Sequence, residues 1–178
     1  MRTRLRGLTQ AALMTAVTVV MAQVSIPLYP GLPFTMQTFA VMLTGLLLNA
    51  KYAALSAIVY LLIGAAGLPV FSGFRSAGAL AGPTGGFLIS FPIAACVISC
   101  LARTKGGKRR VTRFAACLLG LVFVYALGTA QFSFVTHTNY VTVLGINAPF
   151  MLLDAVKALI AVLAVDVINM GINGRRTV

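Results

Sequence analysis

Acidic side chains are almost missing from this chain of 178 residues. It contains two aspartates, Asp154 and Asp166, and no glutamate. The two lie roughly 18 Å apart along a helix, which is too far for an acid–base pair. There is one histidine, His137, and no Cys-x-x-Cys pair, so neither a metal cluster nor a disulfide framework is indicated. We therefore expect no enzyme, no metal and no cofactor.

Charged residues of either sign are also scarce. They make up 9% of the chain, against roughly 25% in soluble domains, while 60% of the residues are hydrophobic. The net charge of +12 would suggest a nucleic-acid partner in a polar chain. Here the apolar content leaves no large hydrated basic face for nucleic acid. The composition predicts an integral membrane protein whose main surroundings are the lipid bilayer.

The apolar segments predict an all-α, polytopic bundle of six transmembrane helices in a single domain covering residues 1–178. A helix that crosses the hydrocarbon core needs about twenty residues. The turn-rich segment 27–31 should end the first helix, and the glycine-rich segment 70–82 should follow the third as an outer loop. The helices are expected at about 8–26, 33–48, 51–67, 83–102, 113–134 and 149–170.

The basic residues predict the orientation, because cytoplasmic loops are enriched in Lys and Arg. With six helices and both termini in the cytoplasm, twelve of the fourteen basic residues fall on the cytoplasmic side. An odd number of helices would place the termini on opposite sides and break this pattern. The two exceptions are Arg75, in the outer loop, and Lys157, inside the sixth helix.

Asp154 and Lys157 are charged residues within an apolar helix. Their spacing of three places both on one helix face. Each would cost about 2.5–3.5 kcal/mol in hydrocarbon, so they should pair, face a polar cavity, or both. One interpretation is a structural salt bridge. The other is a ligand pocket near the outer end of the bundle, which Arg75 enters from the outer loop.

Three further features have simple packing interpretations. Gln37 and Gln131 lie near the outer ends of the second and fifth helices, where they could form hydrogen bonds between helices. Ala12 and Ala16 are four residues apart, which gives the first helix a small-residue face for packing on another helix. The glycine-rich segment 73–86 lacks the Gly-Lys-Ser/Thr ending of a phosphate loop, so it indicates a tight loop over a pocket and no nucleotide site.

Four segments together carry a family resemblance that covers nearly the whole chain. They are Pro-Phe-Thr-Met-Gln-Thr-Phe at 33–39, Gly-Leu-Pro-Val-Phe-Ser-Gly at 67–73, Gly-Pro-Thr-Gly-Gly-Phe-Leu at 82–88 and Asp-Ala-Val-Lys-Ala at 154–158. With them the sequence resembles the BioY family, the biotin-specific substrate-binding (S) component of energy-coupling factor (ECF) vitamin transporters. Two positions depart from the family pattern: Leu152-Leu153 stands where many relatives have Pro-Gly, and Phe74 stands where glycine is common.

The resemblance implies a six-helix S component of the bacterial plasma membrane that binds biotin with high affinity near the outer face. Asp154 and Lys157 match the family's Asp-x-x-Lys, and Arg75 matches the polar position of its glycine-rich loop. Ala12 and Ala16 resemble the alanine motif that docks on the coupling (T) protein. Because the sequence contains no ATP-binding motif, uptake would take its energy from that protein and two ATPase subunits.

Biotin's chemistry suits these side chains. Its urea offers two N–H donors, which an ionised Asp154 can accept, and a carbonyl. Lys157 or Arg75 can donate to that carbonyl or to the ligand carboxylate, while Phe71 can cover the ring and Gln37 completes the expected set. Other classes remain open: a stand-alone secondary carrier of biotin or a related vitamin, a membrane enzyme, or a scaffold without a small ligand.

Overall fold

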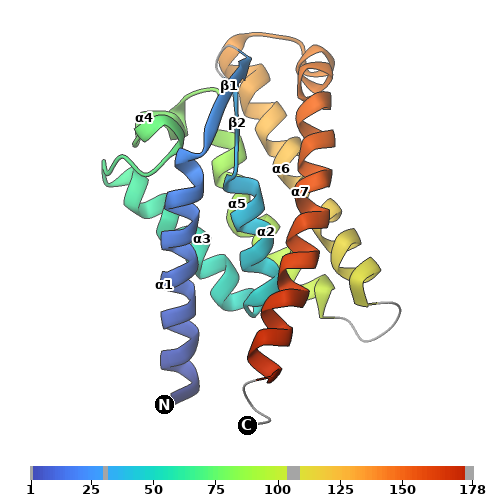
Figure 1. Cartoon of the computed structure of the whole chain (residues 1–178). Helices are drawn as coiled ribbons and strands as arrows, with labels where there is room; N and C mark the ends of the chain where they lie inside the picture. The colour runs from blue at the N-terminus through green and yellow to red at the C-terminus, as the bar shows by residue number, and fades with distance from the viewer. Residues whose placement is uncertain (1, 30–31, 104–108, 175–178) are drawn as a thin grey trace.

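The computed structural model describes residues 2–29, 32–103 and 109–174. Six long helices run alternately up and down, so that α1 begins and α7 ends at the same end of the bundle (Figure 1). The expectation of an all-α bundle of six helices is confirmed. The long helices are α1 (Arg2–Gln23), α2 (Gln37–Leu47), α3 (Ala50–Ala65), α5 (Gly85–Ala102), α6 (Arg109–Thr136) and α7 (Tyr140–Gly174).

Within the described residues, three helices are long and apolar enough to cross a membrane: Thr3–Gln23, Gly85–Ala102 and Arg109–Thr136. Helices α2 and α3 are apolar but shorter. Large apolar side chains cover much of the outer surface, as at Val20, Val122 and Leu152, which are 65%, 60% and 71% exposed. Such extensive apolar exposure is typical of a surface that faces lipid.

A β-hairpin replaces the turn expected between the first two helices. Strand β1 (Ser25–Tyr29) pairs antiparallel with β2 (Leu32–Thr35), and Pro27 lies opposite Pro33. Prolines are tolerated here because a two-stranded ribbon consists of edge strands. The predicted helices 8–26 and 33–48 were therefore too long at this end: α1 ends at Gln23 and α2 begins at Gln37.

The last helix begins earlier than expected. The sequence predicted helices over 113–134 and from Pro149 with a loop between them, but α6 continues to Thr136 and α7 already begins at Tyr140. Pro149 therefore lies inside α7. Helix α7 begins where the side chain of Asn139 accepts a hydrogen bond from the backbone N–H of Val141 (2.9 Å). His137 lies in the short connection with a left-handed φ of 53°.

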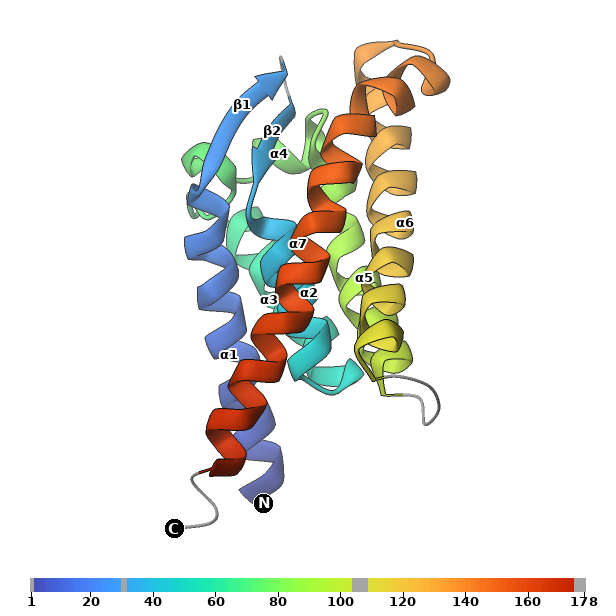
Figure 2. The same ribbon diagram turned by 45° about the vertical axis from the view of Figure 1, so that its right-hand side comes forward.

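Close backbone approach joins α5 to α6. A Cβ atom on Gly86 would lie 2.3 Å from the carbonyl oxygen of Leu127, so only glycine fits there. At the end of the bundle that carries the N-terminus, Asp166 of α7 accepts hydrogen bonds from Arg110 and Arg113 of α6, each at 2.6 Å. These contacts join α6 to both α5 and α7, and Figure 2 shows α6 beside α7 at the hairpin end of the bundle.

Candidate ligand-binding site

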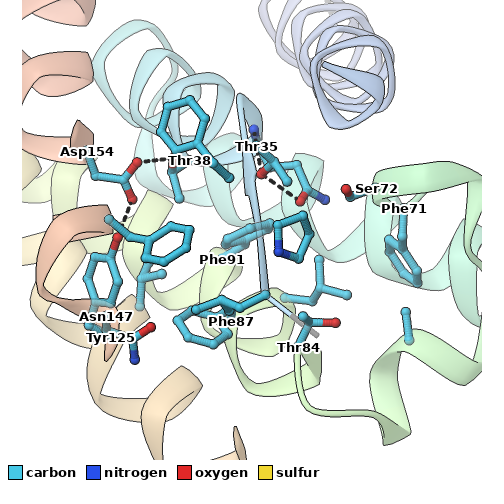
Figure 3. A pocket seen from close by; sticks show the side chains of 18 of the residues that line it. Thr35, Thr38, Phe71, Ser72, Thr84, Phe87, Phe91, Tyr125, Asn147 and Asp154 are labelled. Carbon is cyan, nitrogen blue, oxygen red and sulfur yellow. Dashed lines mark hydrogen bonds between the residues drawn. The ribbon is translucent and has the colours of Figure 1, made fainter. Parts of the chain in front are cut away.

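A cavity lies near the end of the bundle that carries the hairpin. It encloses about 630 Å³ of space between protein atoms, a figure that includes the open solvent at its mouth. Its walls come from β2, α2, the segment around η1 (Ser72–Phe74) and α4 (Gly78–Ala81), and helices α5, α6 and α7 (Figure 3). The structure brings together here all five residues expected to bind ligand: Gln37, Phe71, Arg75, Asp154 and Lys157.

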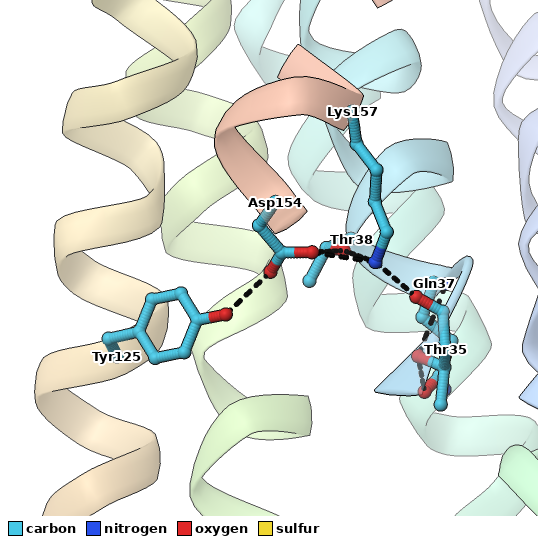
Figure 4. Close-up of polar contacts among 6 residues, drawn as sticks. All are labelled: Thr35, Gln37, Thr38, Tyr125, Asp154 and Lys157. Atoms are coloured by element: carbon cyan, nitrogen blue, oxygen red, sulfur yellow. Dashed lines mark hydrogen bonds and ion pairs between the residues drawn. The ribbon is translucent and has the colours of Figure 1, made fainter. Parts of the chain in front are cut away.

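Asp154 and Lys157 form the buried ionic centre of this site. Nζ of Lys157 lies 2.6 Å from Oδ1 of Asp154, and the two residues are only 5% and 4% exposed. The hydroxyl of Thr38 donates to the same oxygen (2.9 Å), while the hydroxyl of Tyr125 donates to Oδ2 (2.8 Å; Figure 4). Three donors thus stabilise a carboxylate that would be costly to bury unpaired.

Lys157 has partners beyond Asp154. Its Nζ donates to the carbonyl oxygen of Thr35 (2.6 Å) and lies 3.8 Å from the centre of the Phe34 ring, which adds a cation–π contact. The two residues of the salt bridge therefore also line the cavity. The two interpretations of this pair are compatible in geometry.

Gln37 forms the hydrogen bond between helices that its position suggested. Its amide donates to the hydroxyl of Tyr60 on α3 (2.5 Å), and its carbonyl oxygen accepts from the hydroxyl of Thr35 (3.0 Å). Tyr60 in turn packs edge-on against Phe71, with ring centroids 5.3 Å apart. Gln37 therefore also positions the aromatic ring that closes one side of the cavity.

Arg75 stands at the exposed side of the cavity. Its Nε donates to the carbonyl oxygen of Ser72 (3.1 Å). Within the described part of the chain, no carboxylate pairs with it, because Asp154 is bound to Lys157 and Asp166 to Arg110 and Arg113. Arg75 is thus a cation in the cavity wall that is available to an anionic group.

The segment that carries Phe71 is held to the end of α1 by Gln23. The Gln23 amide donates to the carbonyl oxygens of Val70 and Phe71 (3.3 Å each), and its own oxygen accepts from the N–H of Phe74 (3.2 Å). Phe74 has a left-handed φ of 57°, a backbone conformation that favours glycine. Gln23 therefore fixes a strained turn beside the cavity.

Gln131 holds the other end of this segment. As its position suggested, it forms a hydrogen bond between helices: its amide donates to the carbonyl oxygens of Leu80 in α4 (2.7 Å) and of Gly82 (2.9 Å). It thus connects α6 to the end of α4. Gln23 and Gln131 therefore hold the two ends of the glycine-rich segment by hydrogen bonds, as expected of a tight loop over a pocket.

Several residues that line the cavity were not predicted from the sequence. Thr38, Tyr125 and Asn147 come from three different helices and meet only in the fold. Thr84 belongs to the Gly-Pro-Thr-Gly-Gly block, but nothing in the block identified its hydroxyl as part of the wall. Two signals were available: the family motif at 33–39 contains Thr38, and Tyr125 is a polar residue inside an apolar helix.

Ala12 and Ala16 lie outside the cavity. Both are exposed on the outer face of α1, whereas Ala11 and Thr15 point into the bundle. Small exposed side chains let the backbone of another helix approach closely.

The fold and the cavity together define a membrane helix bundle with a cavity of polar and aromatic side chains near one end. Comparison with known proteins makes this specific: the BioY family model matches residues 1–173. The chain belongs to the BioY family. It is therefore related to transporters, and not to enzymes.

Relatives support the assignment along most of the chain. The Thermotoga maritima protein named "Biotin transporter BioY" is 40% identical over 160 residues, covering 89% of this chain and 93% of its own. The Pyrococcus horikoshii "Probable biotin transporter BioY" is 38% identical over 156 residues, covering 87% and 91%. A crystal structure of the S-component for biotin from an ECF-type ABC transporter superposes with a TM-score of 0.85 at 26% identity, covering 95% and 93%.

Proposed function

We propose that this protein binds biotin with high affinity at the outer face of the bacterial plasma membrane and acts as the substrate-specific S component of an ECF-type ABC transporter. The observation that carries the proposal is the combination of a neutral Asp154–Lys157 pair and an unpaired Arg75 around one apolar cavity. Family membership and the names of the relatives support biotin as the ligand.

The cavity's polar groups lie on opposite sides. Asp154 and Tyr125 occupy the α6–α7 side, while Ser72 occupies the other, beside the Phe71 ring (Figure 3). The lone pairs of Asp154 suit an N–H of the urea ring. Because Lys157 is already neutralised, we assign the ligand carboxylate to Arg75. Phe87 and Phe91 would cover the apolar ring and chain between these two ends.

Features at the two ends of the molecule support the proposed orientation and the proposed assembly with the coupling protein. The end where α1 begins carries Arg4, Arg6, Lys51 and Arg103, which supports a cytoplasmic position under the positive-inside rule. The cavity then opens toward the outside. The exposed alanine face of α1 supports docking of the coupling protein, through which two ATPase subunits would supply energy.

Calorimetric titration of biotin into the detergent-purified protein tests the ligand. Saturable binding with one biotin per chain is expected, with biotin methyl ester binding more weakly because it lacks the charge that Arg75 would meet. Absence of saturable biotin binding by the folded protein would overturn the proposal. If the protein binds biotin but no ATPase subunit co-purifies with it from the native membrane, the assignment of biotin as ligand holds and the proposed ECF assembly is refuted.

A further inference from the structure

Two buried polar atoms in the described ranges, Oδ1 of Asn147 and Oγ1 of Thr84, have no hydrogen-bond partner in the protein. Both residues line the same cavity. Buried polar groups are nearly always hydrogen-bonded, so such an exception calls for a partner from outside the chain. That both exceptions line one cavity indicates that the partner is the ligand.

The position of Asn147 is fixed. The residue is 0% exposed, and its Nδ2 donates to the hydroxyl of Thr129 on α6 (2.8 Å), which is also fully buried. This bond turns Oδ1 toward the cavity as a neutral acceptor. Asn147 precedes Asp154 by seven residues, about two helical turns, so both side chains project from the same side of α7. Figure 3 shows Asn147 and Tyr125 together on this side of the pocket.

We infer that Asn147 is a specificity-determining residue that accepts one urea N–H of the ligand, while the Thr84 hydroxyl, beyond Phe87 in Figure 3, meets another part of the ligand. The inference rests on the proposed function and deepens it. Asp154 has three protein donors already, so it offers the ligand few remaining lone pairs. A urea presents N–H donors on two edges, and Asn147 supplies the acceptor that the ionic centre does not. The site thereby selects an uncharged urea over an isosteric group without a donor.

A cycle between variants and ligand analogues tests this inference. Biotin and its two cyclic carbamate analogues, in each of which oxygen replaces one urea N–H, are titrated into the wild-type protein and into Asn147→Leu. Loss of a neutral hydrogen bond should lower biotin affinity about tenfold in Asn147→Leu. One carbamate should bind the wild type at least tenfold more weakly than biotin, yet bind Asn147→Leu about as well as biotin does.

Asn169→Leu, the same change on α7 outside the cavity, is the matched control and should bind all three ligands like the wild type. If Asn147→Leu does not fold, Thr84→Val takes its place, since it is isosteric and should lose biotin affinity several-fold. Near-wild-type biotin binding by the folded variants overturns the inference, as does an equal loss for biotin and both carbamates. Failure of the wild type to bind biotin overturns the proposed function and this inference with it.

Discussion

The Tyr125 hydroxyl donates a hydrogen bond of 2.8 Å to Oδ2 of Asp154, from a neighbouring helix and within a buried site. It is the only described protein donor to that oxygen; Lys157 and Thr38 both bind Oδ1. The bond therefore determines how Asp154 presents its second oxygen to the cavity. It also connects α6 to α7 well away from the ion pairs of Asp166.

Tyr125→Phe should weaken this site without changing its shape. A hydrogen bond to a charged group contributes about 1.5–3 kcal/mol, so we expect a lower unfolding temperature and a loss of biotin affinity of about tenfold. Thermal unfolding and calorimetry on the purified protein measure both. Tyr140→Phe, at an exposed position at the start of α7, is the control. Equal behaviour of the two variants would contradict a role for the Tyr125 hydroxyl.

Asp154→Asn and Lys157→Met test whether the buried pair binds ligand or only stabilises the fold. Removing one partner of a buried pair costs about 3–5 kcal/mol, so each single variant should be less stable. The double variant should recover much of that stability because no charge is left unpaired. If the pair serves the ligand, biotin affinity stays about ten- to a hundredfold lower in the double variant. Wild-type affinity there would identify a purely structural salt bridge.

Gly64→Ala should disturb the cavity through Phe71. A Cβ at position 64 would lie 2.1 Å from the Phe71 ring, which must then move, and that ring lines the cavity. We expect weaker biotin binding in calorimetry together with reduced stability. Gly145→Ala is the matched change, because its Cβ would meet no atom within 4 Å. Alanine there should keep affinity and add up to about 1 kcal/mol of stability to α7.

Bulky substitutions test whether the exposed alanine face of α1 docks on the coupling protein. Ala12→Trp with Ala16→Trp should abolish co-purification of the coupling protein and leave biotin binding near normal, because both side chains face away from the cavity. Ala126→Trp with Ala130→Trp places the same bulk on an exposed, equally spaced pair of α6 and should keep assembly. Retained assembly in the α1 variant would refute this docking face.

Cysteine labelling tests the orientation. In a background without the native cysteines, a membrane-impermeant thiol reagent should label Ser76→Cys in intact cells, because the η1–α4 segment lies at the predicted outer end. Lys51→Cys, in the first turn of α3 at the predicted cytoplasmic end, should react only after the cells are broken. The reverse pattern would mean that the cavity opens to the cytoplasm.

Much of the site could be predicted because charge in an apolar segment is conspicuous. Asp154 and Lys157 were identified from their cost in hydrocarbon, and Arg75 from its isolation in a glycine-rich loop. Phe71 and Gln37 came from their place in family motifs. All five line the cavity.

The other site residues and the hairpin could not be predicted because they depend on contacts between residues that are distant in sequence. Thr38 and Tyr125 look like ordinary residues of apolar helices until α2, α6 and α7 pack together. Asn147 was placed in a loop, because Pro149 was interpreted as a helix start when it lies inside α7. The hairpin was missed because Pro27 was interpreted as part of a turn and Pro33 as the start of the second helix. A two-stranded ribbon does not need the N–H groups that these prolines lack.

Gln23 gives α1 a mechanical connection to the cavity. The helix with the exposed alanine face ends in a side chain that holds the backbone of Val70, Phe71 and Phe74. Any partner that tilts α1 must either carry this segment along or break its three hydrogen bonds. The tilt of α1 and the position of the backbone that carries the Phe71 ring are therefore linked, so the outer helix and one wall of the cavity form a single mechanical unit.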